Sequence, residues 1–154
     1  MEKQYLIDII GTQLIDNQEE TITLTTACSY TNKNNKYYIV YDEYDDDDTS
    51  EKITSTLKVE GEQKVTLIKS GKRNARLVLE KDKRQQCLYS TEFGNLIVGV
   101  STTSILSSLN NDGGTLDISY SLDINSGLSS INNISIKVRK GLNNKNVENS
   151  SSNN

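Results

Sequence analysis

The sequence predicts a small all-β domain, built as a single antiparallel barrel of about eight to ten strands. Three observations predict it. Apolar and polar residues alternate along most of the chain, short polar turns separate the alternating segments, and β-branched and aromatic residues are frequent within them. The 154 residues suffice for one domain with a core of its own.

The alternation is clearest from Thr115 to Ile124, where Leu, Ile and Tyr share one face and Thr, Ser and Asp share the other. The segment from Thr21 to Tyr30 follows the same pattern. A helix would spread these apolar residues around its whole circumference, so the period of two indicates strands. Read in this way, the chain has ten strands, near residues 4–13, 20–30, 36–44, 52–60, 64–70, 75–81, 85–91, 95–106, 115–125 and 129–140.

The connectors between these segments carry residues suited to tight turns. Asn32–Asn35, Gly61–Gln63, Asp112–Gly114 and Asn125–Gly127 all offer side chains that tolerate positive φ or cap a turn. Such short links join antiparallel neighbours, which makes the topology a meander. Closure into a barrel removes the free edges of so large a sheet, and a β-sandwich is the alternative.

Two polar segments fall outside the alternating pattern. Tyr44–Glu51 is expected to form an acidic loop, because the consecutive residues Asp45–Asp48 lack both the spacing and the glycine of a calcium loop. Residues 142–154 are mostly Asn and Ser and are expected to form a disordered tail. The barrel domain is therefore predicted over residues 1–141.

The composition argues against most enzyme classes. The chain contains no histidine, which removes the Ser-His-Asp and Cys-His mechanisms and nearly all familiar zinc hydrolase sites. Cys28 and Cys87 are expected to be small buried residues rather than metal ligands. We therefore expect a protein that is not an enzyme and that needs no metal or other cofactor.

The charge and hydropathy of the chain bear on its partners and location. A net charge of −4 argues against nucleic acid as a partner, and the basic stretch from Lys64 to Arg84 concentrates its charges in predicted turns, where solvated charge is ordinary. No apolar run approaches the roughly 20 residues that span a bilayer. The N-terminus lacks the apolar region of a signal peptide, so a cytoplasmic protein is expected.

Several polar residues lie inside predicted strands. Glu43 continues the apolar row of Tyr37, Ile39 and Tyr41, and Arg76 lies on the face opposite Leu77 and Leu79. A buried carboxylate requires a partner, so we hypothesise that Glu43 and Arg76 form a polar cluster in the barrel lumen. Such a cluster could bind a small polar or anionic ligand, although a solvent-facing pair or a purely structural network is the alternative. The candidate ligand-binding residues are Tyr41, Glu43, Arg76, Tyr89, Thr91 and Tyr120.

Five segments in order resemble the YwiB-like family of bacterial proteins, over nearly the whole chain to about residue 140. They are Tyr37–Glu43, Lys69–Gly71, Arg76–Leu79, Tyr89–Gly94 and Gly113–Tyr120. The family is a domain of unknown function, described as a calycin-like, and hence lipocalin-like, β-barrel. Calycin-like barrels usually bind small hydrophobic or amphipathic ligands in the lumen, so the resemblance implies such a ligand by analogy of fold.

The chain departs from the family pattern at two positions. The family pattern has an aromatic residue in the aromatic-x-Tyr-x-Glu element, where this chain has Ile39. It has Phe at the end of the Arg-Leu-x-Phe element, where this chain has Leu79. The Tyr-x-Thr-x-x-Gly element is matched by Tyr89, Thr91 and Gly94. None of these motifs is a catalytic signature. We thus expect a barrel that binds a small molecule, with a protein-interaction module as the competing hypothesis; the sequence does not give the oligomeric state.

Overall fold

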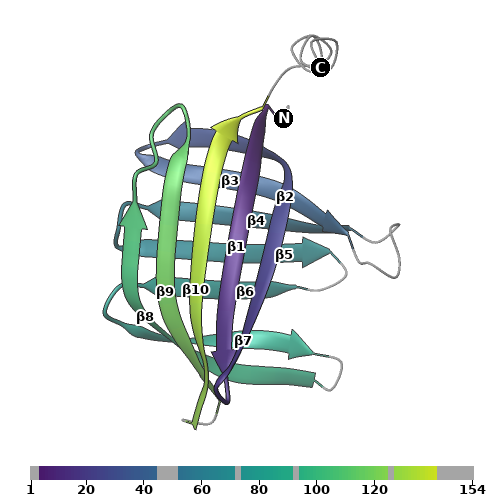
Figure 1. Cartoon of the computed structure of the whole chain (residues 1–154), viewed down its shortest axis with the longest axis vertical. Coiled ribbons are helices and arrows are strands. Elements are labelled where there is room, and N and C mark those ends of the chain that lie inside the picture. Colours follow the sequence, from purple (N-terminus) through teal and green to yellow (C-terminus); the bar gives the residue numbers. More distant parts are fainter. Residues whose placement is uncertain (1–3, 45–51, 72–73, 92–93, 125–126, 142–154) are drawn as a thin grey trace.

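The computed structural model describes residues 4–44, 52–71, 74–91, 94–124 and 127–141. This part of the chain holds ten antiparallel strands and no helix, arranged as one nearly closed barrel (Figure 1). The all-β barrel is thereby confirmed over the sandwich. The strands are β1 (Tyr5–Ile15), β2 (Gln18–Lys33), β3 (Lys36–Tyr44), β4 (Lys52–Glu60), β5 (Lys64–Gly71), β6 (Ala75–Glu80), β7 (Arg84–Thr91), β8 (Gly94–Ser107), β9 (Gly114–Ile124) and β10 (Gly127–Lys140).

Each strand pairs with its neighbours in the chain, and β10 returns to pair with β1. This closing ladder is long and regular, from Tyr5 opposite Lys140 to Leu14 opposite Ile131. The result is the up-and-down meander that the short connectors predict. In Figure 1, β8, β9, β10 and β1 run along the long axis, and β3 to β6 run across behind them.

Two hairpins set the register of the first three strands. Asp16 and Asn17 join β1 to β2, and Asn34 and Asn35 join β2 to β3. All four residues have φ between 49° and 65°, the left-handed region that two-residue hairpins of mirror-image type require. Because these turns are so tight, β2 extends to 16 residues, longer than the alternation alone predicts.

The barrel has one weak seam, between β6 and β7. Within the described residues these strands share a single register pair, Ala75 opposite Tyr89. The turn that follows β6 bonds elsewhere instead: the Asp82 amide donates to the Thr102 carbonyl (2.8 Å), and the Lys81 amide donates to the Gln63 carbonyl (2.9 Å). The turn thus holds β6 in place from one end.

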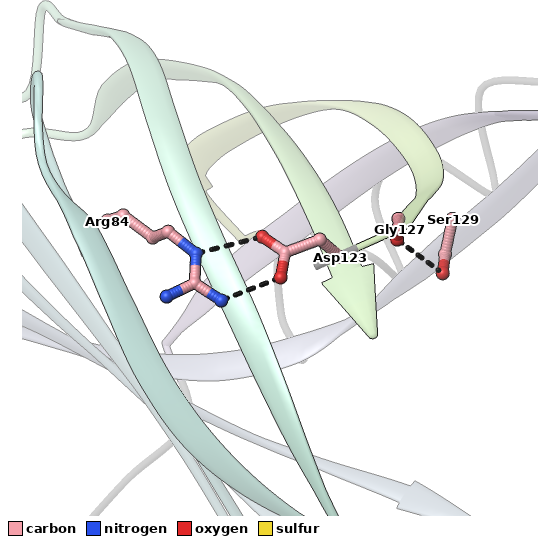
Figure 2. Close-up of polar contacts among 4 residues, drawn as sticks. All are labelled: Arg84, Asp123, Gly127 and Ser129. Atoms are coloured by element: carbon pink, nitrogen blue, oxygen red, sulfur yellow. Dashed lines mark hydrogen bonds and ion pairs between the residues drawn. The ribbon is translucent and has the colours of Figure 1, made fainter. Parts of the chain in front are cut away.

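An ion pair on the outer surface bridges β7 and β9 across β8 (Figure 2). The Arg84 guanidinium donates from Nε and Nη2 to the two Asp123 carboxylate oxygens, at 3.0 and 2.7 Å. The glycine between them in the sheet, Gly99, makes room: a Cβ there would lie 2.3 Å from Arg84 Nη2. The guanidinium holds the pKa of the Asp123 carboxyl below its usual value.

Three tyrosines close one end of the barrel. The rings of Tyr5 and Tyr30 meet edge to face at 5.2 Å, and those of Tyr30 and Tyr37 stack at 5.4 Å. The Tyr30 hydroxyl donates to the Asn110 carbonyl at 2.6 Å, which ties the β8–β9 connector over this end. The burial of Tyr30 raises the pKa of its phenol, which therefore stays neutral.

The apolar core lies behind these tyrosines. Cys28 and Cys87 belong to it as buried residues outside any disulfide, which confirms their predicted role as small core residues. The other buried apolar members are Ile7, Ile39, Tyr41, Leu57, Val59, Val65, Leu79, Val98, Val100, Ile105, Leu116, Ile118, Ile136 and Val138.

Some of the predicted features lie outside the described residues. These are the consecutive aspartates Asp45–Asp48 and the polar tail 142–154. Within the described ranges, no helix has the length and apolar character to cross a membrane. The same ranges contain no group of three or more Cys, Asp or Glu side chains placed to hold a metal ion.

Candidate functional site

The lumen contains a cavity of about 410 Å³. It reaches from the middle of the barrel toward the end opposite the tyrosine cap, where Ile22 lines it and is nevertheless 71% exposed. The wall is mainly aliphatic, because the luminal face of each strand carries the apolar half of its alternation. Its aliphatic residues are Ile9, Ile22, Leu24, Leu57, Leu67, Leu77, Ile134 and Ile136.

One row of register partners brings polar side chains to this wall. Tyr41 of β3 lies opposite Ser55 of β4, Ser55 opposite Lys69 of β5, and Lys69 opposite Ala75 of β6. Directly opposed residues in a sheet point to the same side, so the row shares the luminal face. Ala75 contributes little volume, which leaves space beside the Lys69 ammonium.

Glu43 lies two residues beyond Tyr41, and its carboxylate is held by this row. Lys69 Nζ lies 3.2 Å from Glu43 Oε2, and the Ser55 hydroxyl donates to the same oxygen at 3.3 Å. The side chains of Glu43 and Lys69 are 29% and 34% exposed, so the pair is only partly screened by water. The site thus places an ion pair at the edge of an apolar cavity, which a second carboxylate, that of Glu20, also lines.

Tyr41 lies deeper than this ion pair. Its burial, helped by the nearby Glu43 carboxylate, raises the pKa of the phenol to about 12, and a hydrogen bond with Ser55 acts in the opposite direction. The phenol is therefore neutral at any ordinary pH and can donate a hydrogen bond.

The opposite wall adds Tyr120 of β9 and Asn132 of β10, which are register partners. The Asn132 amide donates to the Ser130 hydroxyl at 2.9 Å, and both side chains are buried. Polar groups thus face the cavity from both sides of the barrel, while the aliphatic residues lie between them.

The structure brings together three of the six candidate residues predicted from the sequence. Tyr41, Glu43 and Tyr120 all line the cavity. The expected luminal position of Arg76 is wrong: Arg76 is exposed on the outer face, because its neighbours Ala75 and Leu77 are the β6 residues that line the cavity. Lys69 takes the place of Arg76 as the partner of Glu43.

Tyr89 and Thr91 belong to β7, and their side chains lie outside the described part of the structure. The backbone of Tyr89 pairs with Ala75 and so continues the row of Tyr41, Ser55 and Lys69. Its predicted place in the site stays a prediction.

Among its described residues, the basic stretch from residue 64 to residue 84 does not form a common basic surface. Lys69 lies in the lumen, whereas Arg76 is exposed on the outer face. Lys83 pairs with Glu80 at 3.0 Å, and Arg84 is engaged by Asp123. Binding of nucleic acid gains no support from this arrangement.

Sequence reasoning missed Lys69, Ser55 and Asn132. The pattern that could have found Lys69 is the one that found Glu43, since Lys69 ends the alternating luminal row of Val65 and Leu67. Ser55 and Asn132 gave no such indication, because short polar side chains are equally common on the solvent face of a strand.

Comparison with known proteins places the chain in a defined group. Residues 7–136 match the profile of a family described as a domain of unknown function (DUF1934). The uncharacterized β-barrel protein YwiB of Bacillus subtilis is 30% identical over 128 residues, which cover 82% of this chain and 86% of YwiB. The crystal structure of the B. subtilis YwiB protein matches with a TM-score of 0.77 at 26% identity, covering 90% of this chain and 92% of that one.

Proposed function

Since this chain belongs to the DUF1934 family of β-barrel proteins, whose function is unknown, we propose from its own geometry that it is a binding protein. Its lumen binds one small, largely apolar molecule that carries a polar group, and the protein catalyses no reaction on it. The observation that carries the proposal is the cavity of about 410 Å³. Its volume lies within the range of about 300–1,000 Å³ that is typical of small-molecule sites.

The lining supports a ligand with two chemically different parts. Aliphatic side chains from β1, β2, β4, β5, β6 and β10 cover most of the wall and favour an apolar body. The Tyr41 phenol, the Glu43–Lys69 pair and the Tyr120 side chain are among the polar groups of the lining that can orient a bound molecule. Tyrosines cap one end of the barrel, and the lining residue Ile22 is exposed at the other end. This arrangement supports entry of the ligand from the Ile22 side.

Two finer points belong to the same proposal. A chain without histidine has few means of general acid–base catalysis at neutral pH, which supports binding without chemistry. Buried cysteines outside any disulfide, such as Cys28 and Cys87, are typical of a reducing compartment, which supports a cytoplasmic location. A calycin-like barrel, which the family resemblance implies, would add support by analogy of fold alone.

A cavity-filling variant with a matched control tests the proposal. The probe is N-phenyl-1-naphthylamine, a neutral dye whose fluorescence rises in apolar surroundings. Ala75→Phe directs an aromatic ring into the cavity beside Lys69, whereas Arg76→Phe places the same ring on the outer face of the same strand. We expect one dye molecule to bind wild type and Arg76→Phe, and binding to Ala75→Phe to be weaker by about tenfold or more, as for loss of a buried ring-sized contact.

Native mass spectrometry of protein purified from its own host looks for the natural ligand. A co-purified small molecule that is lost from Ala75→Phe and kept by Arg76→Phe supports the proposal. Equal dye binding by all three proteins, or no binding by wild type together with a ligand-free mass, contradicts it.

A further inference from the structure

Strand β2 has a long edge that the barrel leaves unpaired. On one side, β2 pairs with β1 along its length from Gln18 to Cys28. On the other side, β3 pairs with it only from Cys28 to Lys33. Within the described part of the chain, the ten residues 18–27 therefore have a strand neighbour on one side alone. Figure 1 shows the cause, since β2 turns across the top of the barrel, where β3 runs beside it, while β3 crosses behind the earlier part of β2.

An unpaired edge presents a regular row of backbone N–H and C=O groups. Water can hydrogen-bond these groups one by one, but the protein partner that matches the whole row in register is another extended chain. The residues of the edge are Gln-Glu-Glu-Thr-Ile-Thr-Leu-Thr-Thr-Ala, which favour the extended conformation through Thr, Ile and Leu.

Most of this edge lacks protection against association. Proteins guard free edges with charged side chains, above all lysine, with proline or with a bulge. Residues 18–27 contain no lysine, proline or bulge, and their only charges, those of Glu19 and Glu20, lie at one end of the edge. The seam at β6 and β7 provides an internal comparison, because it is flanked by Arg76, Glu80, Lys83 and Arg84. Charge thus lines the weak seam, whereas residues 21–27 of the β2 edge carry none.

Exposed apolar side chains gather around the same hairpin. Ile22 is 71% exposed, and Ile10, Leu14 and Ile15 of β1 are 49%, 37% and 41% exposed. Three of these are register partners of β2 residues 18–23, with Ile10 opposite Thr23. A free edge flanked by apolar side chains is typical of a surface that another protein chain covers.

We propose that residues 18–27 of β2 pair antiparallel with the same residues of a second copy of the chain, forming a symmetric dimer. The two identical strands are related by a two-fold axis perpendicular to the sheet. Odd-numbered residues therefore lie opposite odd-numbered residues and even opposite even, and the luminal faces of the two copies lie on the same side of the joint sheet. The register centred on Thr23 pairs Thr23 with itself, Thr21 with Thr25, and Ile22 with Leu24.

This register suits the side chains on both faces. It places Glu20 opposite Thr26 rather than opposite another carboxylate or an aliphatic residue. The outer face gains Thr–Thr pairs, which are favourable across antiparallel strands. Ile22 meets Leu24 of the second copy beside the cavity that both residues line, so the partner strand borders the entrance of the proposed ligand site.

Two variants that carry opposite charges at the same central position of the interface test the proposal. Thr23→Lys and Thr23→Glu each place two like charges face to face across the two-fold axis, on the outer face and away from the cavity. Thr56→Lys is the control, because it puts the same charge on the outer face of β4, which is paired on both sides. Sedimentation velocity over a range of protein concentrations gives the oligomeric state of each variant and of a one-to-one mixture of the two Thr23 variants.

We expect wild type and Thr56→Lys to form dimers. Each Thr23 variant alone is expected to raise the dissociation constant by about tenfold or more, and the mixture is expected to form a heterodimer. Wild type that remains monomeric at every concentration overturns the proposal, as does a dimer that persists in both Thr23 variants. Thermal unfolding and circular dichroism show that each variant is folded, and dye binding to the lumen is measured separately.

Discussion

The ion pair between Glu43 and Lys69 is predicted to stabilise the barrel in addition to lining its cavity. Lys69 Nζ lies 3.2 Å from Glu43 Oε2, and both side chains keep about a third of their surface exposed. Exposed pairs contribute about 0.2–1 kcal/mol because water screens them, whereas breaking a fully buried pair costs about 3–5 kcal/mol. The intermediate exposure of this pair predicts a coupling free energy of about 1 kcal/mol.

A double-mutant cycle measures this coupling directly. Urea unfolding of wild type, Glu43→Gln, Lys69→Met and the double variant gives the free energy of unfolding of each protein. The control cycle uses Lys140 and Asp112, whose charged atoms lie 3.3 Å apart but whose side chains are 64% and 84% exposed. Since the nitrogen–oxygen distances of the two ion pairs match, the two cycles differ mainly in how deeply the charged side chains are buried.

The control pair should show no measurable coupling. The Glu43–Lys69 coupling should also fall only slightly when salt is added, because partly buried charges are poorly screened by ions. A coupling below about 0.3 kcal/mol for Glu43 and Lys69, which is the usual limit of additivity, would refute this reasoning.

Two further predictions concern the rest of the barrel. Tyr30→Phe removes the 2.6 Å hydrogen bond to the Asn110 carbonyl and should lower the free energy of unfolding by about 1 kcal/mol. Tyr5→Phe is the control and should change this free energy little, because the Tyr5 hydroxyl bond is 3.4 Å long. Equal losses for the two variants in urea unfolding would contradict the assigned geometry. The lowered pKa of Asp123 means that its pairing with Arg84 stabilises the fold above about pH 4 and is lost as the pH falls through the folded-state pKa. Wild type should therefore exceed Asp123→Asn in melting temperature at pH 6, with the difference shrinking toward pH 2, and a pH-independent difference would rule this linkage out.

Local alternation predicted the strands and the direction of most side chains. Side-chain direction in a strand is decided by the residue next to it, so Glu43 could be assigned to the luminal face from Ile39 and Tyr41 alone. The same rule places Arg76 outside, since Leu77 and Leu79 determine the inner face of β6. The prediction for Arg76 was wrong because it chose a partner for Glu43 by its charge and not by the side of the strand on which that partner lies.

The identity of that partner depends on contacts that alternation cannot give. Lys69 is 26 residues from Glu43 in the chain, and the two meet only because β4 holds both neighbouring strands in fixed register. That register is set by hairpin geometry and by the packing of the whole barrel, so one residue of slip would move Lys69 to the outside. The weak seam at β6 and the early departure of β3 from β2 are likewise products of closure, in which all ten strands take part.

The departure of β3 from β2 links the two proposals made for this protein. Where two neighbouring strands part, the barrel both opens its lumen and leaves a strand edge unpaired. Ile22 illustrates both effects, since it lines the cavity and lies on the free edge of β2. A second chain along this edge would narrow the entrance, so a ligand that fills the lumen and a partner that pairs with β2 must share the same opening. Dimer formation by wild type should therefore slow the release of a bound dye, and Thr23→Lys should restore fast release without changing the residues that line the cavity.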